Sequence, residues 1–265
     1  MIRRVIRSSA LLLSAALLTG CGGRASDVIF LPTAADLTDP LLELAGVGSE
    51  DVVADLGCGD GRIVIRAAQR AGARGVCVEI DPGLVARSRA AADTAGVAHR
   101  IRFVEGDLFE APLGGVTVVT LYLSPALNER LRPKLFRELA PGARVVSHNF
   151  GMGDWVADSV ITVAGTRGTS SALRLWVIPA DVAGRWTLEL DGSDAARTYD
   201  LRFEQQYQRI TATASRGGAS VSVSAATLSG SAIAFTLGHG ADARRLSGMV
   251  ESARMHGPGW KAWRR

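Results

Sequence analysis

A glycine-rich turn near residue 55 has the residue types needed to hold a small charged ligand against backbone amides. It reads Asp55-Leu-Gly-Cys-Gly-Asp-Gly61 and follows an apolar run that begins at Val52. Glycines let the backbone approach a ligand closely, and the free amides at the start of the next helix favour a carboxylate or phosphate. A turn of this kind after the first strand predicts a ligand of nucleotide type.

Two further acidic residues follow the next two apolar runs. Glu79 lies at the end of the run Gly75–Ile80, and Asp107-Leu108 comes shortly after the run Ile101–Val104. The carboxyl ends of parallel strands meet at one edge of a sheet. We therefore expect these acids to converge on the glycine-rich turn.

The elements that would position these residues alternate between strand and helix from residue 52 to residue 178. This alternation predicts a doubly wound, seven-stranded α/β sheet covered on both faces, within a domain spanning 34–179. We expect a first helix capped by Thr33 and interrupted or kinked at Pro40, and a division at Pro133 of the helical stretch that follows Ser124-Pro125. The expected strands are 52–56, 75–80, 101–104, 116–123, 143–147, 160–163 and 173–178, and the main helices are 62–71, 82–95 and 125–139.

The pattern changes after Pro179. Apolar residues alternate with polar ones in short runs separated by Gly, Ser and Asp, and no proline occurs from 180 to 257. This period of two predicts a small antiparallel all-β domain over 180–265, either a sandwich or a small barrel. We expect Trp260 and Trp263 to close one end of it.

The pattern D-x-G-x-G-x-G resembles the first motif of class I S-adenosylmethionine-dependent methyltransferases. The resemblance implies a Rossmann-like fold, S-adenosylmethionine as cofactor, the first acid and glycines on its methionine part, Glu79 on the ribose and Asp107 near the adenine. A fold that binds a nicotinamide cofactor, or nothing, is the alternative. The implied cofactor-binding residues are Asp55, Gly57, Cys58, Gly59, Gly61, Glu79, Asp107 and Leu108.

Residues 30–178 also resemble a narrower group, the small protein-lysine methyltransferases that act on adenine nucleotide translocase and on the ATP synthase c-subunit, with their bacterial relatives. The stretches that carry this resemblance are Asp55–Ile63, Ser88-Arg89, Leu131–Leu135, Gly142–Val146 and Asp154-Trp155. The resemblance implies a protein lysine as methyl acceptor.

The segment Thr120–Pro125 lacks the Asn/Asp-Pro-Pro-Tyr/Phe motif of nucleic-acid amino methyltransferases. We therefore expect no nucleic-acid partner. Residues 1–20 hold three of the 30 basic residues and no acid, so the remaining chain has 27 basic and 26 acidic residues. This balance leaves no broad basic surface for nucleic acid.

Methyl transfer from a sulfonium is an in-line displacement that depends mainly on positioning. The candidate catalytic residues lie after the fourth and fifth strands. They are Tyr122, Ser124, Asn128 and His148, with Asn149 beside them. Trp155 is either a wall of the acceptor channel or plain core, and His148 is either a proton acceptor or a structural residue.

Two other functions remain open. One is a methyltransferase with a small-molecule acceptor. The other is a lipid-anchored binding protein that keeps the fold and has lost the chemistry, with the β domain holding a ligand or partner. The retained acids and glycines favour the two enzyme hypotheses.

The first residues resemble a bacterial lipoprotein signal. Arg3, Arg4 and Arg7 precede an apolar run, Ala10–Leu18, which is too short to span a bilayer. Leu18-Thr-Gly-Cys21 resembles the lipoprotein box, which implies cleavage after residue 20, lipidation of Cys21 and a tether over 21–33. We expect a membrane-anchored protein on the periplasmic or extracytoplasmic face, with a cytoplasmic protein as the alternative if the signal is not used.

The other two cysteines, Cys58 and Cys77, show neither a disulfide framework nor the spacing of a metal site. We therefore expect them to be free thiols in the core, and we expect no bound metal.

Overall fold

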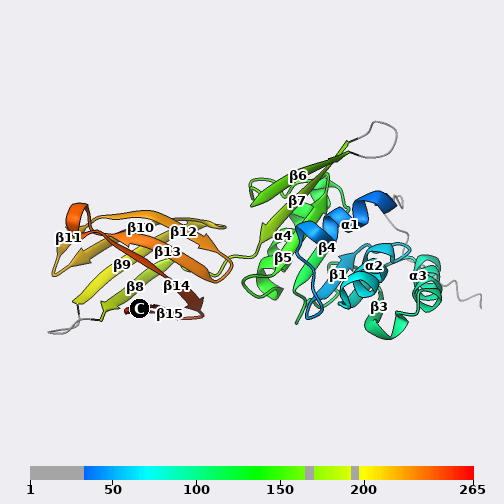
Figure 1. Cartoon of the computed structure of the whole chain (residues 1–265), viewed down its shortest axis with the longest axis horizontal. Helices are drawn as coiled ribbons and strands as arrows, with labels where there is room; N and C mark the ends of the chain where they lie inside the picture. Colours follow the sequence, from blue (N-terminus) through cyan, green and yellow to red (C-terminus); the bar gives the residue numbers. More distant parts are fainter. Residues whose placement is uncertain (1–32, 165–169, 192–196) are drawn as a thin grey trace, which may run out of the picture.

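The computed structural model describes residues 33–164, 170–191 and 197–265, which form two sheets, one in each half of an elongated molecule (Figure 1). The predicted signal and Cys21 lie outside these residues, as does the tether apart from Thr33. Among the described residues, no helix combines the length and the apolar character needed to cross a membrane.

The first sheet has seven strands and contains the glycine-rich turn. Its order is β3-β2-β1-β4-β5-β7-β6, with β1 to β5 parallel and β7 antiparallel to both of its neighbours. The order reverses between β1 and β4, which is where open α/β sheets bind ligands. The strands are β1 (Val52–Leu56), β2 (Arg74–Glu79), β3 (Ile101–Glu105), β4 (Val118–Leu121), β5 (Arg144–His148), β6 (Ser159–Ala164) and β7 (Ser170–Val177).

Helices cover both faces of this sheet, as the alternation of elements predicts. One face packs Val53, Val118 and Val146 under the first two helices, and the other packs Leu56, Leu121 and other apolar residues under α4. The helices are α1 (Ala35–Leu44), α2 (Arg62–Ala71), α3 (Pro82–Thr94) and α4 (Pro125–Glu138), with a 3-10 turn at Ala98–Arg100.

Three local expectations are wrong. Pro40 lies inside α1 and Pro133 inside α4, so α1 is not interrupted and α4 is not divided, and a kink at Pro40 stays a prediction. Leu131 and Leu135 flank Pro133 and are fully buried, so packing on the sheet outweighs the roughly 3 kcal/mol that an interior proline costs. The N-cap of α1 is Ala34 rather than Thr33, without a side-chain cap.

The second sheet is antiparallel and has nine strands within the described residues. Its order is β11-β10-β9-β8-β16-β15-β14-β13-β12, and β10 also contacts β12, so the sheet nearly closes as a small barrel would. The strands are β8 (Gly184–Leu190), β9 (Arg197–Gln206), β10 (Arg209–Arg216), β11 (Ala219–Val221), β12 (Val223–Ser229), β13 (Ala232–Leu237), β14 (Arg244–Glu251), β15 (Arg254–Gly257) and β16 (Trp260–Arg264), with a 3-10 turn at Gly240–Asp242 before β14.

The two tryptophans near the end of the chain differ in their surroundings. Trp260 is buried and meets Phe235 edge to face inside the sheet. Trp263 is 39% exposed. It pairs with Thr187 and Arg254 in the ladder and points outward, because the inward positions of β16 are Trp260 and Ala262. The expectation that both tryptophans close one end is therefore wrong for Trp263.

The turn between β9 and β10 docks the β domain on the α/β domain. The Tyr207 hydroxyl donates to Asp154 Oδ1 at 2.9 Å, and the Trp155 indole donates to Gln208 Oε1 at 2.9 Å. Trp155 is 1% exposed and packs against Phe136 and Tyr207. Of the two interpretations offered for Trp155, the structure supports the core residue.

Candidate active site

The glycine-rich turn leaves β1 and forms an open backbone cradle at the carboxyl edge of the first sheet. Gly57, Gly59 and Gly61 have φ of 83°, 55° and 76°, a region that disfavours residues with a Cβ atom. A Cβ atom on Gly61 would also lie 2.9 Å from Ser88 Cβ. Gly61 is the N-cap of α2 and provides no side-chain cap. The Arg62 amide donates to Asp60 Oδ1 at 3.3 Å, so the next amides of the helix, those of Ile63 and Val64, are the ones suited to a ligand carboxylate.

Glu79 fixes this cradle to the end of β2. Its side chain is buried, and its carboxylate accepts hydrogen bonds from three backbone amides. The Gly59 amide donates to Oε2 at 3.0 Å, and the amides of Ile80 and Asp81 donate to Oε1 at 2.8 and 3.0 Å. The carboxylate therefore has a fixed position beside the turn, where the resemblance places the ribose.

Asp55 is a buried carboxyl group, and none of the described cationic side chains lies beside it. Thr120 donates to its Oδ1 at 2.7 Å from the adjacent strand β4. Burial raises the pKa of Asp55 to about 7, with the nearby charges of Glu79 and Asp60 adding to the rise and the Thr120 hydrogen bond opposing it. A carboxyl group in this state is suited to a ligand with a positive charge, such as the ammonium and sulfonium groups of S-adenosylmethionine.

Asp107 and Leu108 follow β3 on the same edge. The Asp107 carboxylate accepts from the Phe109 amide at 2.8 Å, and Leu108 packs half-buried against the core. The Gly106 amide donates to the Glu79 carbonyl at 2.9 Å, which joins this loop to the end of β2. The structure thus gathers the predicted cofactor-binding residues at one edge, and their contacts with the cofactor stay a prediction.

Cys58 and Cys77 form a disulfide, so the prediction of two free thiols is wrong. The amides of Gly57 and Cys58 both donate to the Val78 carbonyl, which folds the turn over β2. The Cα atoms of the two cysteines are consequently 5.3 Å apart, within the range that a disulfide needs. The bond ties the glycine-rich turn to the strand that carries Glu79.

We expect removal of this disulfide to destabilise the protein. The bond closes a loop over a sequence separation of 19, for which chain entropy gives a stabilisation of about 3 kcal/mol. In urea unfolding, the Cys58→Ala/Cys77→Ala variant should lose about 2–3 kcal/mol of unfolding free energy, and a reductant should lower the wild type to the same level. A wild type that does not respond to reductant would contradict the bond.

Two of the four candidate catalytic side chains lie against each other. The Tyr122 ring stacks on the His148 ring with centroids 4.0 Å apart, and Phe150 extends the stack at 6.1 Å from Tyr122. His148 Nε2 is 3.1 Å from Ser171 Oγ, while its buried Nδ1 has no hydrogen-bond partner among the described residues. Burial lowers the pKa of His148, which favours the neutral imidazole at pH 7.

The other two candidates have structural contacts. Ser124 is exposed and caps α4, accepting from the Leu127 amide at 3.5 Å. Asn128 is fully buried, and its Nδ2 donates to the Gly151 carbonyl at 3.1 Å, while its Oδ1 has no hydrogen-bond partner in the described part of the chain. The structure therefore brings Tyr122 and His148 together, places Asn128 below the loop after β5, and leaves Ser124 at the surface.

Three neighbours of these side chains were not singled out from the sequence: Thr120, Ser171 and Phe150. Thr120 is a hydroxyl residue inside an otherwise apolar strand, which is a readable signal for a polar partner in the core. Ser171 gives no such signal, because the pairing of β7 with β5 brings it to His148, and Phe150 gives none, because it follows β5 in a loop and stacks on Tyr122. Within the described residues, no cluster of His, Cys, Asp and Glu could hold a metal ion.

The strand order and the glycine-rich turn define a class I S-adenosylmethionine-dependent methyltransferase. The family model of the ANTKMT methyltransferase domain matches residues 55–159. A protein-lysine N-methyltransferase of Saccharolobus islandicus is 42% identical over 137 residues, which are 51% of this chain and 85% of that protein. The chain belongs to this family of methyltransferases, and S-adenosylmethionine is its cofactor.

Other relatives extend the comparison. The adenine nucleotide translocase lysine N-methyltransferase of Mus musculus is 35% identical over 43% of this chain and 50% of that protein, so the chain spans about half the length of this relative. A crystal structure described as an RNA methyltransferase from Salinibacter ruber, in complex with S-adenosyl-L-homocysteine, is 51% identical, with a TM-score of 0.55 over 57% of this chain and 96% of that one.

Proposed function

We propose that this chain is an S-adenosylmethionine-dependent protein-lysine N-methyltransferase. The observation that carries the choice of acceptor is the charge of the five segments that begin at the carboxyl ends of β1 to β5. These segments contain no Lys or Arg and six acids. The segments are 57–61, 80–81, 106–117, 122–124 and 149–158, and the acids are Asp60, Asp81, Asp107, Glu110, Asp154 and Asp158.

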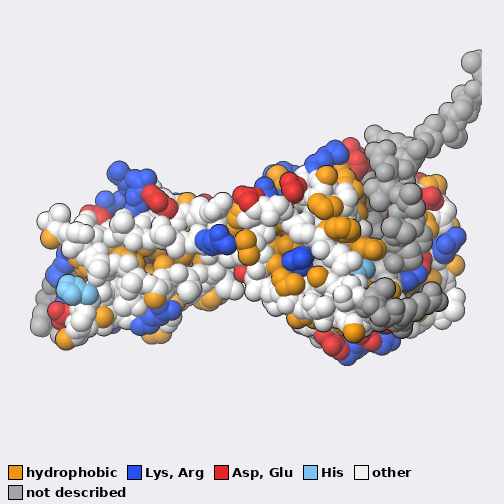
Figure 2. All heavy atoms as spheres, turned by 90° about the horizontal axis from the view of Figure 1, so that it is seen from above, with side chains coloured by type: hydrophobic (Ala, Val, Ile, Leu, Met, Phe, Trp, Pro, Cys, Tyr) orange, Lys and Arg blue, Asp and Glu red, His pale blue; other side chains and the backbone are white. Residues whose placement is uncertain are grey.

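An acidic rim attracts a cationic side chain and repels a phosphate backbone. Two of the six acids are paired with arginines, Asp60 with Arg62 at 2.5 Å and Asp154 with Arg132 at 2.6 Å, so these two add little net charge to the rim. Basic and acidic side chains are also interspersed over the side of the molecule drawn in Figure 2, with no continuous basic face on it. These features favour lysine over RNA, although one solved relative is described as an RNA methyltransferase.

S-adenosylmethionine supplies a methyl group on a sulfonium, which a neutral lysine amine can attack in line. The residues of this chain bind the cofactor, orient the lysine amine toward its methyl group and exclude water. The cradle and Glu79 fix the cofactor side, and the stacked rings of Tyr122 and His148 form an apolar wall near the fourth and fifth strands. An apolar wall favours the neutral amine over the ammonium form, and His148 Nδ1 is a candidate for taking up the released proton.

Transfer of a labelled methyl group from the cofactor to cell extracts tests the acceptor. We expect label in material that protease removes and ribonuclease does not. Label that ribonuclease removes would overturn the lysine assignment, and label only in small molecules would support the small-molecule alternative. The absence of both cofactor binding and methyl transfer would support the alternative of a lipid-anchored protein that has lost the chemistry.

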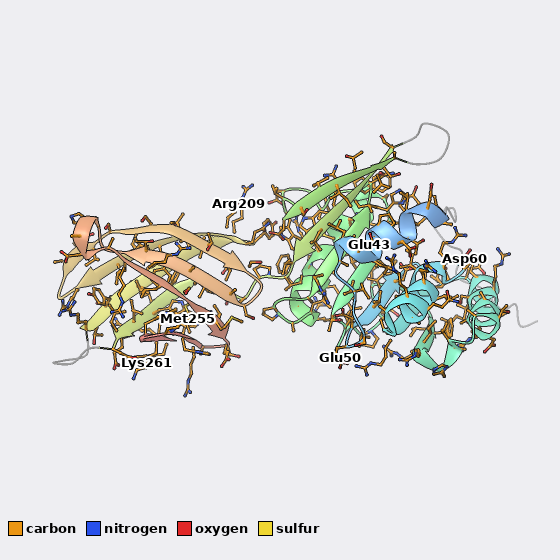
Figure 3. The ribbon with its side chains drawn as sticks, viewed as in Figure 1. Glu43, Glu50, Asp60, Arg209, Met255 and Lys261 are labelled. Carbon is orange, nitrogen blue, oxygen red and sulfur yellow. A yellow bond between two sulfur atoms is a disulfide. The ribbon has the colours of Figure 1, made fainter. Side chains whose placement is uncertain are left out.

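Self-methylation gives little background in this experiment. The chain has two lysines, Lys134 and Lys261. Lys134 is buried and paired with Glu138. Lys261 lies on the β domain, toward the opposite end of the molecule from Asp60 beside the turn (Figure 3). Label on any other protein is therefore easily separated from label on the enzyme.

Replacing His148 with alanine should slow transfer without weakening cofactor binding. Loss of a proton acceptor costs about a hundredfold in kcat. Because burial lowers the pKa of His148 from 6.5, we expect the rate of the wild type to fall as the pH decreases below 6.5. This acid limb of the pH–rate profile should be absent in His148→Ala. The exposed His99→Ala is the matched control. An unchanged pH profile in His148→Ala would show that His148 is structural only.

We further propose that the protein is a lipoprotein held at the extracytoplasmic face of a bacterial membrane through Cys21. Support comes from the Cys58–Cys77 disulfide, because disulfides persist in oxidising compartments and are rare in the cytosol. Labelling with a radioactive fatty acid should mark the wild type and not Cys21→Ala. Labelling of both proteins, or of neither, would contradict the anchor.

A further inference from the structure

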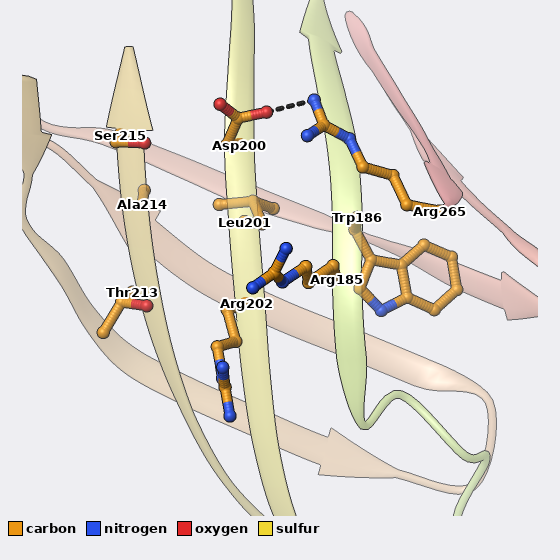
Figure 4. A pocket seen from close by; sticks show the side chains of 9 residues that line it. All are labelled: Arg185, Trp186, Asp200, Leu201, Arg202, Thr213, Ala214, Ser215 and Arg265. Atoms are coloured by element: carbon orange, nitrogen blue, oxygen red, sulfur yellow. Dashed lines mark hydrogen bonds and ion pairs between the residues drawn. The ribbon is translucent and has the colours of Figure 1, made fainter. Parts of the chain in front are cut away.

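The outer face of β8, β9 and β10 has a hollow of about 260 Å³ that the methyltransferase site does not use (Figure 4). It lies in the β domain, in a sheet that does not contain the cofactor cradle. The polar and charged residues that line it are Arg185, Arg202, Arg265, Asp200, Thr213 and Ser215.

Two arginines of this hollow face each other across the ladder. Arg185 and Arg202 are direct register partners on β8 and β9, and both are exposed. Neither takes part in a salt bridge within the described residues. Like charges at opposing positions destabilise a sheet. This pair therefore destabilises the ligand-free protein, and an anion bound between the two guanidinium groups would restore the lost stability.

The acids nearby do not neutralise this pair. Asp200 forms an ion pair with Arg265, as the dashed line in Figure 4 shows. Arg265 also donates from Nε to the Thr187 hydroxyl at 2.7 Å, which fixes it at the rim. Glu204, two residues beyond Arg202 on the same face, does not line the hollow.

Hydroxyl groups complete the floor of the hollow. Thr213 is the register partner of Arg202 on β10, and Ser215 is the partner of Asp200. Hydroxyls and guanidinium groups are all hydrogen-bond donors, and guanidinium binds phosphate oxygens in a bidentate geometry. The donors come from three adjacent strands, so their positions are fixed by the ladder.

We propose that this hollow is a phosphate-binding site, with Arg185 and Arg202 as its principal ligands and Thr213 and Ser215 as supporting donors. The phosphate belongs either to a phospholipid head group or to a soluble phosphate compound. Trp263 favours the first source, because it is exposed on the same outer face, one strand away from Thr187. Exposed tryptophan beside arginine is typical of surfaces that meet the head-group region of a bilayer.

Thermal unfolding of the full chain in phosphate and in chloride at equal ionic strength tests the site. We expect phosphate to raise the midpoint of the wild type by about 2–4 °C. The Arg185→Gln/Arg202→Gln variant should lose this rise, while in chloride it should be as stable as the wild type or more stable. Arg209→Gln, an exposed arginine of β10 near the domain junction (Figure 3), is the control and should keep the rise.

Co-sedimentation with vesicles separates the two sources of phosphate. With phosphatidylglycerol vesicles, the double variant should bind about tenfold more weakly than the wild type and than Arg209→Gln, and phosphatidylcholine vesicles should show no such difference. Loss of the thermal response without a change in vesicle binding would assign the site to soluble phosphate compounds. A wild type with no phosphate-specific rise, or a double variant that keeps the rise, would overturn the site.

Discussion

Replacing Asp55 with asparagine is expected to weaken S-adenosylmethionine binding about a hundredfold or more, and at the same time to stabilise the ligand-free protein at pH 8. The buried carboxylate offers its charge to a cationic ligand, and removing one partner of a buried charge pair costs several kcal/mol of binding. Asparagine still accepts the Thr120 hydrogen bond, so the fold keeps its contact. Titration calorimetry gives the affinity, and urea unfolding gives the stability.

The sign of the stability change follows from the pKa of Asp55. The pKa is about 7 in the folded protein and 3.8 in an ordinary setting. Between these values the folded state holds a proton that the unfolded state has released, so the stability from the neutral carboxyl is present below pH 3.8 and is lost as the pH rises to 7. The loss amounts to about 4 kcal/mol at pH 8, and the asparagine variant should not show it.

Asp60 provides a control for which the expected change in unfolding free energy has the opposite sign. Its hydrogen bond with Arg62 lowers the pKa of Asp60, so Asp60→Asn should destabilise the protein at pH 8. An Asp55→Asn variant that binds cofactor as tightly as the wild type would contradict the assigned pocket. One that is destabilised at pH 8 would contradict the raised pKa of the buried Asp55 carboxyl group.

Replacing Glu79 with alanine should disrupt the cradle itself. Its carboxylate accepts from the buried amide of Gly59 and from the partly buried amides of Ile80 and Asp81, and all three donors would lose this partner. We expect a loss of about 2–3 kcal/mol of unfolding free energy and about a hundredfold weaker cofactor binding. Glu79→Gln keeps one accepting oxygen and should lie between the alanine variant and the wild type in both measurements.

Glu105 is a matched control for Glu79. It is the register partner of Glu79 on the neighbouring strand and is exposed at the same edge of the sheet. Glu105→Ala should change the unfolding free energy by less than about 0.5 kcal/mol and leave the affinity unchanged. Equal effects of the two alanine variants would mean that general acidity at this edge, rather than the Glu79 hydrogen bonds, supports the cradle.

Sequence patterns predicted the features that depend on local chemistry. The turn of Gly57, Gly59 and Gly61 and the strand-end acids Glu79 and Asp107 were readable because chain order alone places parallel strand ends at one edge. The alternation of apolar and polar residues after Pro179 likewise indicated the antiparallel sheet. These features are determined by short stretches of residues and by the topology that they permit.

The features that the sequence did not predict depend on tertiary contacts. Cys58 and Cys77 are separated by a helix, and only the folding of the turn over β2 brings them together. Pro133 is tolerated because the helix face around it is buried. The Tyr122–His148 stack arises from two separate strand ends. None of these contacts leaves a periodic or spaced signal in the chain.

The site at the carboxyl edge of the first sheet is proposed to transfer a methyl group to lysine. The most direct measurement is amino-acid analysis of acid-hydrolysed protein after incubation of extracts with methyl-labelled S-adenosylmethionine and the enzyme. At a cofactor concentration below saturation, we predict label in N-methylated lysine with the wild type and about a hundredfold less with Asp55→Asn. Label in any other residue or in nucleosides, or equal label with the variant, would contradict lysine methylation at this site.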